Sequence, residues 1–178
     1  MVRQSRPISF TRRASRRLSA PLLVLALGLA SQVASAQVFA SPDWKESPVP
    51  PAPEFDARRM IEIDMPRMLD LKYGVDPKTL AITGDGVVRF VIIAKSTGPG
   101  AAMNASYDGV RCATGETKTY ARYSGDAWHE VENPEWKPLE QARTRYNLAL
   151  ARQAICRSGA PRATVDEMVR ELKKPQYY

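Results

Sequence analysis

Residues Thr83–Ser96, TGDGVVRFVIIAKS, carry the clearest fold signal of this chain. Asp85-Gly86 stands between two extended runs, where glycine supplies the positive φ that a tight hairpin turn requires. The run that follows, Val87–Lys95, is apolar on both faces of a strand apart from Arg89. A strand with two apolar faces is covered on both sides, so we predict that this run is the central strand of a sheet.

The glycines of GDG also suggest a phosphate or metal loop, and the sequence argues against both. A P-loop requires a longer glycine-rich loop that ends in Gly-Lys-Ser/Thr and opens a helix. A dinucleotide fingerprint requires G-x-G-x-x-G, and a calcium loop of the EF-hand type requires more oxygen ligands and a closing glutamate. Asp85, Asp108 and Asp126 could converge on a cation, but separated turn aspartates are usually solvated. We therefore predict a turn, with no metal and no cofactor.

Residues 1–36 have the order of a secretory signal. A leader with six arginines and no acidic residue precedes the apolar run Pro21–Ala30 and the small-residue end Ala34-Ser35-Ala36. This order predicts export with cleavage after Ala36, and the arginine pairs leave the general and twin-arginine routes open. The apolar run is shorter than the about 20 residues that cross a bilayer. We expect no stable transmembrane span after cleavage, with a retained anchor as the alternative.

Cleavage changes the meaning of the charge. The whole chain has 26 Lys+Arg and 19 Asp+Glu, a formal net charge of +7. Without the leader, 20 basic and 19 acidic residues remain, so the mature chain is nearly neutral. It also lacks a cluster of basic residues interleaved with aromatic ones. The basic isoelectric point of the full chain therefore says nothing about nucleic acid, and we predict no nucleic-acid partner.

The cysteines predict one crosslink. The 142 residues from Gln37 to Tyr178 suffice for one domain with its own core. They contain two cysteines, Cys112 and Cys156. In an oxidising compartment we expect such a pair to form a disulfide. Two separate buried thiols are the alternative, because spacing alone does not prove pairing.

A proline-rich segment separates the signal from the domain. Residues 37–56 are predicted to be an extended linker, since their prolines disfavour helices and sheet ladders. The segment could act as a spacer, as a strap over the domain, or as a recognition segment of the PxxP type. Residues 57–175 are predicted to form a single α+β domain.

That domain is predicted to contain an antiparallel sheet of about five to six strands followed by two C-terminal helices. Asp108-Gly109 lies within one extended run, where the glycine indicates a bulge or bend. Pro138 is placed to begin the first helix. Thr164 and Glu167 form a capping pair for the second helix, and Pro175 ends it. Thr79–Thr83 is predicted to be a short strand. Period-two alternation marks the other strands besides the central one: Met60–Asp64, Leu69–Val75, Met103–Cys112 and Thr117–Tyr123.

The sequence shows no set of residues with matched catalytic roles. His129 is the only histidine, which excludes multi-histidine metal sites and leaves one candidate general base. No G-x-S-x-G elbow accompanies it, and a Cys-His pair would need a thiol that the disulfide removes. We therefore predict no catalytic residues and a protein that is not an enzyme. A small periplasmic hydrolase that uses His129 is the alternative, and thiol redox work is a third hypothesis.

Candidate binding residues lie around the central strand. We predict contact through Arg89, Arg111 and Trp128. Aromatic residues could add a ligand platform, although core and edge packing explains most such residues. The residues of this platform would be Trp44, Tyr120, Tyr123, Trp128 and Trp136.

Several pieces of the chain follow one another in a familiar order. GDGVVRF and NASYDGVRCATGETKTYARY are followed by Trp128 and Trp136, and then by YNLALARQAIC. This order and spacing, from about Trp44 to Lys174, resembles the CNP1-like family. Its members are small exported proteins of Gram-negative bacteria with no assigned activity. The resemblance implies an exported periplasmic domain and carries over no catalytic or binding residue. We expect a cell-envelope domain that binds an unknown envelope protein or ligand.

Overall fold

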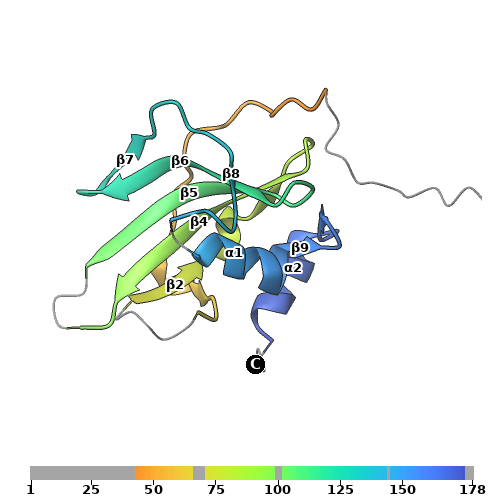
Figure 1. The fold of residues 1–178 in the computed structure, drawn as a ribbon. Coiled ribbons are helices and arrows are strands. Elements are labelled where there is room, and N and C mark those ends of the chain that lie inside the picture. The colour runs from red at the N-terminus through yellow and green to blue at the C-terminus, as the bar shows by residue number, and fades with distance from the viewer. Residues whose placement is uncertain (1–42, 66–70, 99–101, 144, 175–178) are drawn as a thin grey trace, which may run out of the picture. The chain divides into compact units, whose positions relative to one another are not determined.

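The computed structural model of the chain describes residues 43–65, 71–98, 102–143 and 145–174. The predicted signal, residues 1–36, lies outside the described residues, as does Pro175. Figure 1 shows a twisted sheet with the helices packed on one of its faces.

The sheet is antiparallel throughout, in the order β1-β2-β4-β5-β6-β7, while β3 pairs with β4 and β8 with β6. The longest ladder joins β4 to β5, from Val87 opposite Arg111 to Lys95 opposite Met103. The prediction of an α+β fold is confirmed, and the central-strand run lies in β4, inside the sheet. The strands are β1 (Ile61–Glu62), β2 (Leu71–Val75), β3 (Ala81–Ile82), β4 (Val87–Ser96), β5 (Met103–Arg111), β6 (Glu116–Ser124), β7 (Ala127–Glu130) and β8 (Lys137–Pro138).

The GDG motif forms the predicted turn. The N–H of Gly86 donates to the carbonyl oxygen of Thr83 at 2.9 Å, and Gly86 has a φ of 81°. Ile82 of β3 then pairs with Val88 of β4. Strands β7 and β8 were not predicted from the sequence, because both are short and lie where the alternation fades.

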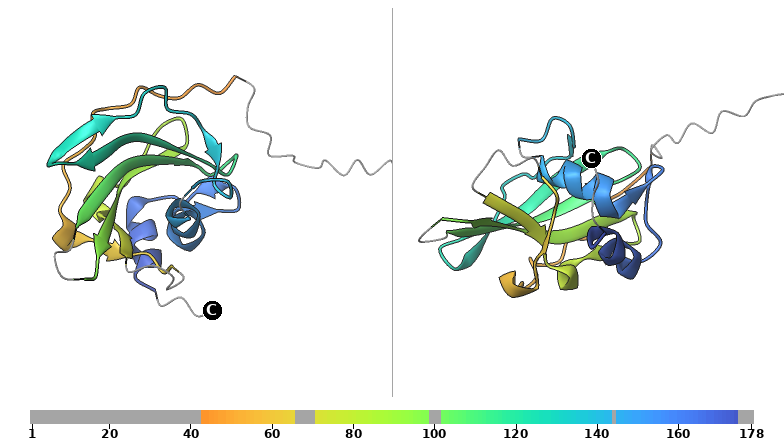
Figure 2. Two further views of the ribbon diagram at one scale, coloured as in Figure 1. Left: turned by 60° about the vertical axis from the view of Figure 1, so that its left-hand side comes forward. Right: turned by 90° about the horizontal axis from the view of Figure 1, so that it is seen from below.

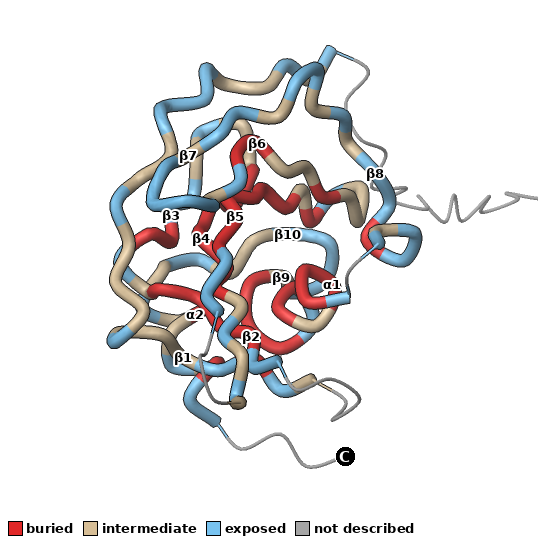
Figure 3. Tube along the Cα trace, turned by 90° about the vertical axis from the view of Figure 1, so that its left-hand side faces the viewer, coloured by how far each residue is buried: buried red, intermediate tan, exposed pale blue. Residues whose placement is uncertain are grey.

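Side chains of β4 alternate between two separate cores. Val88, Phe90 and Ile92 face the helices, whereas Val91 and Ile93 belong to the core on the opposite face. Figure 3 shows buried residues along β4 and β5 and also around α1. Both faces of β4 are therefore covered, as the apolar run predicted.

Two helices pack on the first face, and they follow the sheet as predicted. The first is α1 (Tyr146–Leu150), which continues as the π-helical segment η3 (Ala151–Ile155); the second is α2 (Val165–Leu172). The Thr164 hydroxyl oxygen accepts from the N–H of Glu167 at 3.1 Å and caps α2. Cys112 and Cys156 form the expected disulfide, with a Cα–Cα distance of 5.5 Å. This bond joins the end of β5 to the end of η3.

The predicted helix start at Pro138 is wrong. Lys137 and Pro138 form β8 and pair with Thr117 and Glu116 of β6. Proline is tolerated in a short edge strand because no further neighbour needs its missing N–H. The N–H of Gln141 donates to the Pro138 carbonyl oxygen, but this single turn does not continue into a helix.

The second face of the sheet is covered by an irregular segment, residues 43–56, which we call the strap. It contains no helix or strand and runs on the side of the sheet away from α1 and α2 (Figure 2). At its C-terminal end, Phe55 packs edge-on against Tyr123 and Trp128. The N–H of Asp56 donates to the buried carboxylate of Asp76 at 2.9 Å.

Three short elements complete the described fold. The 3-10 turn η1 (Ala57–Arg59) follows the strap, and η2 (Pro77–Thr79) precedes β3. The hairpin of β9 (Cys156–Arg157) and β10 (Ala160–Pro161) links η3 to α2.

Candidate functional site

A row of three residues crosses the strap-covered face of the sheet. Arg89 of β4 pairs with Gly109 of β5, and Gly109 pairs with Lys118 of β6. Residues that are opposite one another on adjacent strands share a face. The two cations therefore flank a position with no side chain. Together with Tyr120 and Trp136, these three residues form what we call the carboxylate site.

Glu46 of the strap fills this site. Its carboxylate accepts hydrogen bonds from Lys118 Nζ at 2.7 Å and from the Tyr120 hydroxyl at 2.7 Å. Trp136 Nε1 donates a third bond at 3.2 Å. Arg89 Nη2 lies 3.8 Å from the same carboxylate. Four donor groups of the folded domain thus converge on one acidic side chain.

The electrostatics favour an ionised Glu46. Its side chain is 17% exposed and that of Lys118 is 14% exposed, so water screens the pair only partly. Burial alone would raise the pKa of Glu46, but hydrogen bonds from Lys118 and Tyr120 outweigh burial and lower this pKa. Burial raises the pKa of the Tyr120 hydroxyl, and the hydrogen bond to Glu46 raises this pKa further. The hydroxyl therefore keeps its proton and remains a donor. The site binds the charged form of a carboxyl group.

Arg89 holds the backbone of the strap as well as its acidic side chain. Nη1 donates to the Pro48 carbonyl oxygen at 3.0 Å, and Nη2 donates to the Ser47 carbonyl oxygen at 2.7 Å. The Arg89 side chain is only 3% exposed, and its Nε has no partner among the described residues. A buried guanidinium left without acceptors is strongly unfavourable. Apart from the strap, this guanidinium has the Asp85 carboxylate, 3.8 Å from Nη2, so withdrawal of the strap would remove both of its hydrogen-bond acceptors and leave only this ion pair.

Trp44 adds an aromatic contact two residues before Glu46. Its indole N–H donates to the Asp85 carbonyl oxygen at 2.8 Å, and the Arg111 guanidinium lies 3.8 Å from the ring centroid. The ring meets Trp136 edge-on at 5.9 Å. A cation close to an indole face is a favourable interaction.

Asp85 fixes the strap from the GDG turn. Its Oδ2 accepts from the N–H of Ser47 at 2.6 Å, while Oδ1 accepts from the N–H of Val87 and from the Thr83 hydroxyl. Burial opposes ionisation of Asp85, but the bonds from Thr83 and Ser47 are stronger and lower its pKa. The expectation that Asp85 is a solvated turn residue is wrong, because the strap covers the turn.

A bulge in β6 aims Tyr120 at the site. Tyr107 pairs with Ala121 and Asp108 with Thr119, so Tyr120 is the extra residue of β6. A bulge of this kind redirects a side chain. The irregularity predicted at Asp108-Gly109 lies instead in the neighbouring strand, opposite Tyr107 and Asp108. A Cβ atom at Gly109 would lie 2.5 Å from the Tyr120 hydroxyl oxygen. The glycine therefore makes room for this ring.

The helix-facing side of the same strands carries a buried polar network. Asp108 Oδ2 accepts from Ser106 Oγ and Asn147 Nδ2, both at 3.0 Å. Asn147 also donates to Thr117 Oγ1 at 2.9 Å. Asp108 is fully buried, which raises its pKa. The expectation of a solvated turn aspartate is wrong here too, because Asp108 connects the sheet to α1. Of the three turn aspartates, Asp126 alone is exposed.

The structure separates the predicted site residues into groups. Arg89 and Arg111 both contact the N-terminal part of the strap, whereas Trp128 lies on β7 and contacts Phe55. The suggested aromatic platform is likewise divided. Trp44, Tyr120 and Trp136 belong to the carboxylate site and its surroundings, while Tyr123 and Trp128 pack around the other end of the strap.

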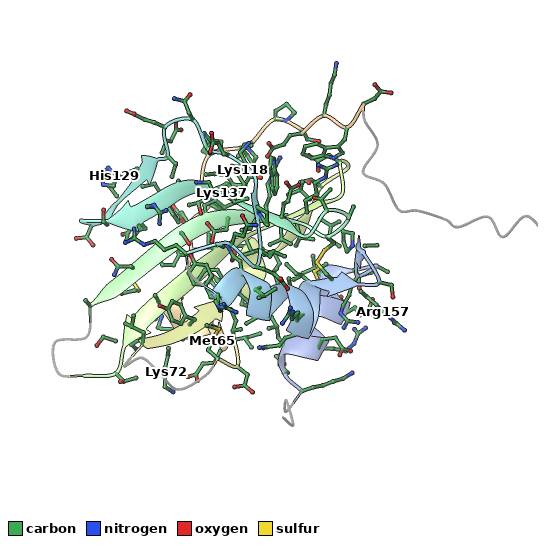
Figure 4. The ribbon with its side chains drawn as sticks, viewed as in Figure 1. Met65, Lys72, Lys118, His129, Lys137 and Arg157 are labelled. Atoms are coloured by element: carbon green, nitrogen blue, oxygen red, sulfur yellow. A yellow bond between two sulfur atoms is a disulfide. The ribbon has the colours of Figure 1, made fainter. Side chains whose placement is uncertain are left out.

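His129 is placed away from this site. It lies on β7, is exposed, and its Nε2 is 3.1 Å from the Ser124 carbonyl oxygen. Figure 4 shows His129 towards one end of β7 and Lys118 on the neighbouring β6, beneath the strap. In the described part of the chain, no group of three or more His, Cys, Asp or Glu residues is arranged to hold a metal ion.

Sequence reasoning missed Glu46 and Lys118. Lys118 alternates regularly with its strand neighbours and resembles any solvated lysine. Glu46 stands in a segment whose prolines predicted a linker. A useful signal was present in Trp44, a large aromatic residue that a purely solvated linker rarely needs.

The fold and the site together define an α+β domain whose second sheet face carries a carboxylate site closed by the preceding segment of the same chain. The sequence profile of the CNP1-like family matches residues 39–173, and the chain belongs to that family. No curated protein and no solved structure matches the chain. Within the described residues, we find no helix with the length and apolar character needed to cross a membrane.

Proposed function

We propose that this protein is an exported cell-envelope domain that binds a partner through the strap-covered face of its sheet and catalyses no reaction. One observation carries this proposal. Arg89, Lys118, Tyr120 and Trp136 converge on Glu46, a carboxylate supplied by a segment without secondary structure. The donors stand on or beside paired strands, as the groups of a preorganised binding site do.

The strap contacts the sheet as a bound ligand would, and it does not pair with the sheet as an additional strand. No backbone-to-backbone hydrogen bond joins residues 43–55 to the described part of the sheet. Its polar contacts instead use side chains, such as those of Asp85 and Arg89. Such an attachment can open without breaking a sheet ladder.

Two features support export. Residues 1–36 have the order of a cleaved signal, and a disulfide is typical of an oxidising compartment. Fractionation followed by N-terminal sequencing tests this part of the proposal. We expect periplasmic protein that begins at Gln37. An uncleaved chain in the cytoplasmic fraction would contradict export.

The hydrolase alternative depends on His129. Its imidazole is exposed and faces a backbone carbonyl oxygen, an environment that does not prepare a general base. We expect a His129→Ala variant to complement a deletion strain fully. Loss of complementation by a variant that still folds would favour the hydrolase.

In-cell photo-crosslinking tests the binding face. A photoreactive residue at Pro138, which is exposed and pairs with Glu116 on the face where Arg111 contacts the strap, reports on this face. The same residue at the exposed Lys72 of β2, two strands beyond β5, is the matched control. We expect a discrete adduct at position 138 that Lys118→Glu abolishes. Equal adducts at both positions, or an adduct that is insensitive to Lys118→Glu, would overturn the proposed face.

A further inference from the structure

The chemistry of the ligand can be inferred from the present occupant. Residues 43–48, which we call the flap, present three features to the domain: an indole at Trp44, a carboxylate at Glu46, and the carbonyl oxygens of Ser47 and Pro48. Each feature has its own partner on the domain. These contacts therefore recognise several groups of a short extended segment, and not only its negative charge.

The flap is separable from the rest of the strap. Residues 49–51 are exposed, and Val49 is 40% exposed. Beyond them, Ala52 and Phe55 pack into the core of the second face, and Asp56 is bonded to Asp76. The flap can thus swing away while residues 52–56 stay anchored, since the two parts have no common partner among these contacts.

An empty site is unfavourable, so exchange is the expected behaviour. Removal of Glu46 would leave Lys118 without its carboxylate partner and the buried Arg89 with only the Asp85 carboxylate, 3.8 Å from Nη2, and buried charges that lose partners are disfavoured. A second carboxylate can supply what the flap withdraws. The flap competes from the same chain, where its effective concentration is on the order of millimolar.

We propose that the carboxylate site binds an extended peptide segment of a partner, with an aromatic residue two positions before a carboxylate, and that the flap is its intramolecular competitor. This inference rests on the proposed binding face and adds the class of ligand and its regulation. Only molecules with an open flap can bind the partner. The apparent dissociation constant is therefore the intrinsic one divided by the fraction of open molecules.

Peptide binding to the purified protein tests this proposal. The probe is a fluorescent peptide with the sequence of residues 43–50, DWKESPVP, and the readout is anisotropy. We expect the Glu46→Gln protein, whose own flap is weakened, to bind the peptide at least roughly 10-fold more tightly than the wild type does. Trp44→Ala is a second opened protein and should behave in the same way.

Matched controls show whether the peptide carboxylate and Lys118 are needed for binding. A peptide with glutamine in place of its glutamate should bind at least roughly 10-fold more weakly. Adding Lys118→Gln to the Glu46→Gln protein should abolish binding, and circular dichroism should show that both variants remain folded. Absence of binding to either opened protein would overturn the proposal. Equal affinity for the two peptides would show that the carboxylate is not read.

Two further results would overturn the regulatory part. Equal affinity of wild-type and opened protein would show that the flap does not compete. A concentration-dependent dimer that the peptide dissociates would identify a second copy of this chain as the occupant. If the crosslinked adduct at position 138 persists while peptide binding fails, the proposed binding face is supported and only the proposed ligand class is wrong.

Discussion

Removal of the Cys112–Cys156 disulfide should greatly destabilise the domain. The bond joins positions that are 44 residues apart. In the chain-entropy model, closing a loop of this length restricts the unfolded chain and stabilises the fold by about 4 kcal/mol at 25 °C. Small domains have a net stability of about 5–15 kcal/mol. The reduced protein should therefore be close to the limit of folding.

Urea denaturation of the oxidised and reduced protein measures this difference. The comparison changes only the crosslink, so it avoids the loss of packing that substitution of a buried cysteine adds. Cys112→Ala/Cys156→Ala should lose at least as much as reduction does. A difference below about 1 kcal/mol between the oxidised and reduced forms would contradict this prediction, because the restricted loop would then contribute little to stability.

Three further substitutions test separate parts of the structure. Burial raises the pKa of Asp108, so wild-type stability should fall as pH rises through that pKa; Asp108→Asn should remove this fall, as pH-dependent denaturation would show. Gly109→Ala should displace the Tyr120 ring and destabilise the fold by about 1–3 kcal/mol; an unchanged urea midpoint would contradict this. Asp76→Ala should destabilise the fold by about 3 kcal/mol, the low end for a broken buried ion pair, because its partner Arg59 is 35% exposed. The backbone amide of Asp56, which donates to Asp76, should then exchange its hydrogen faster, and wild-type protection of this amide would contradict the role of Asp76 as its acceptor.

The sheet could be predicted because its signals are local. The turn needs a positive φ, and Asp85-Gly86 provides it. The central strand needs two apolar faces, and Val87–Lys95 provides them. The first helix could not be placed correctly, since Leu139 fits a helical stripe as well as a strand. Pairing of β8 with β6, together with the bond from the Leu139 N–H to the Gly115 carbonyl oxygen, decides against the helix.

The candidate site was less accessible to sequence reasoning. Arg89 stood out because a charge within an apolar strand needs a partner. The identity of that partner could not be predicted, since Glu46 precedes Lys118 by 72 residues and Trp136 by 90. The strap carries no periodic pattern, and its contacts are made by single side chains. Only the folded arrangement of β4, β5 and β6 brings these groups together.

The most direct test of the account uses the three tryptophans of the chain. Each indole N–H gives one signal in a ¹⁵N-correlated NMR spectrum, and the unlabelled DWKESPVP peptide is titrated into the wild-type protein. The account predicts that Trp44 moves to the position of a free indole while Trp136 keeps a bound position and Trp128 does not change. An unmoved Trp44 signal at saturating peptide, or equal movement of all three signals, would contradict the claim that the flap is an exchangeable occupant of the carboxylate site.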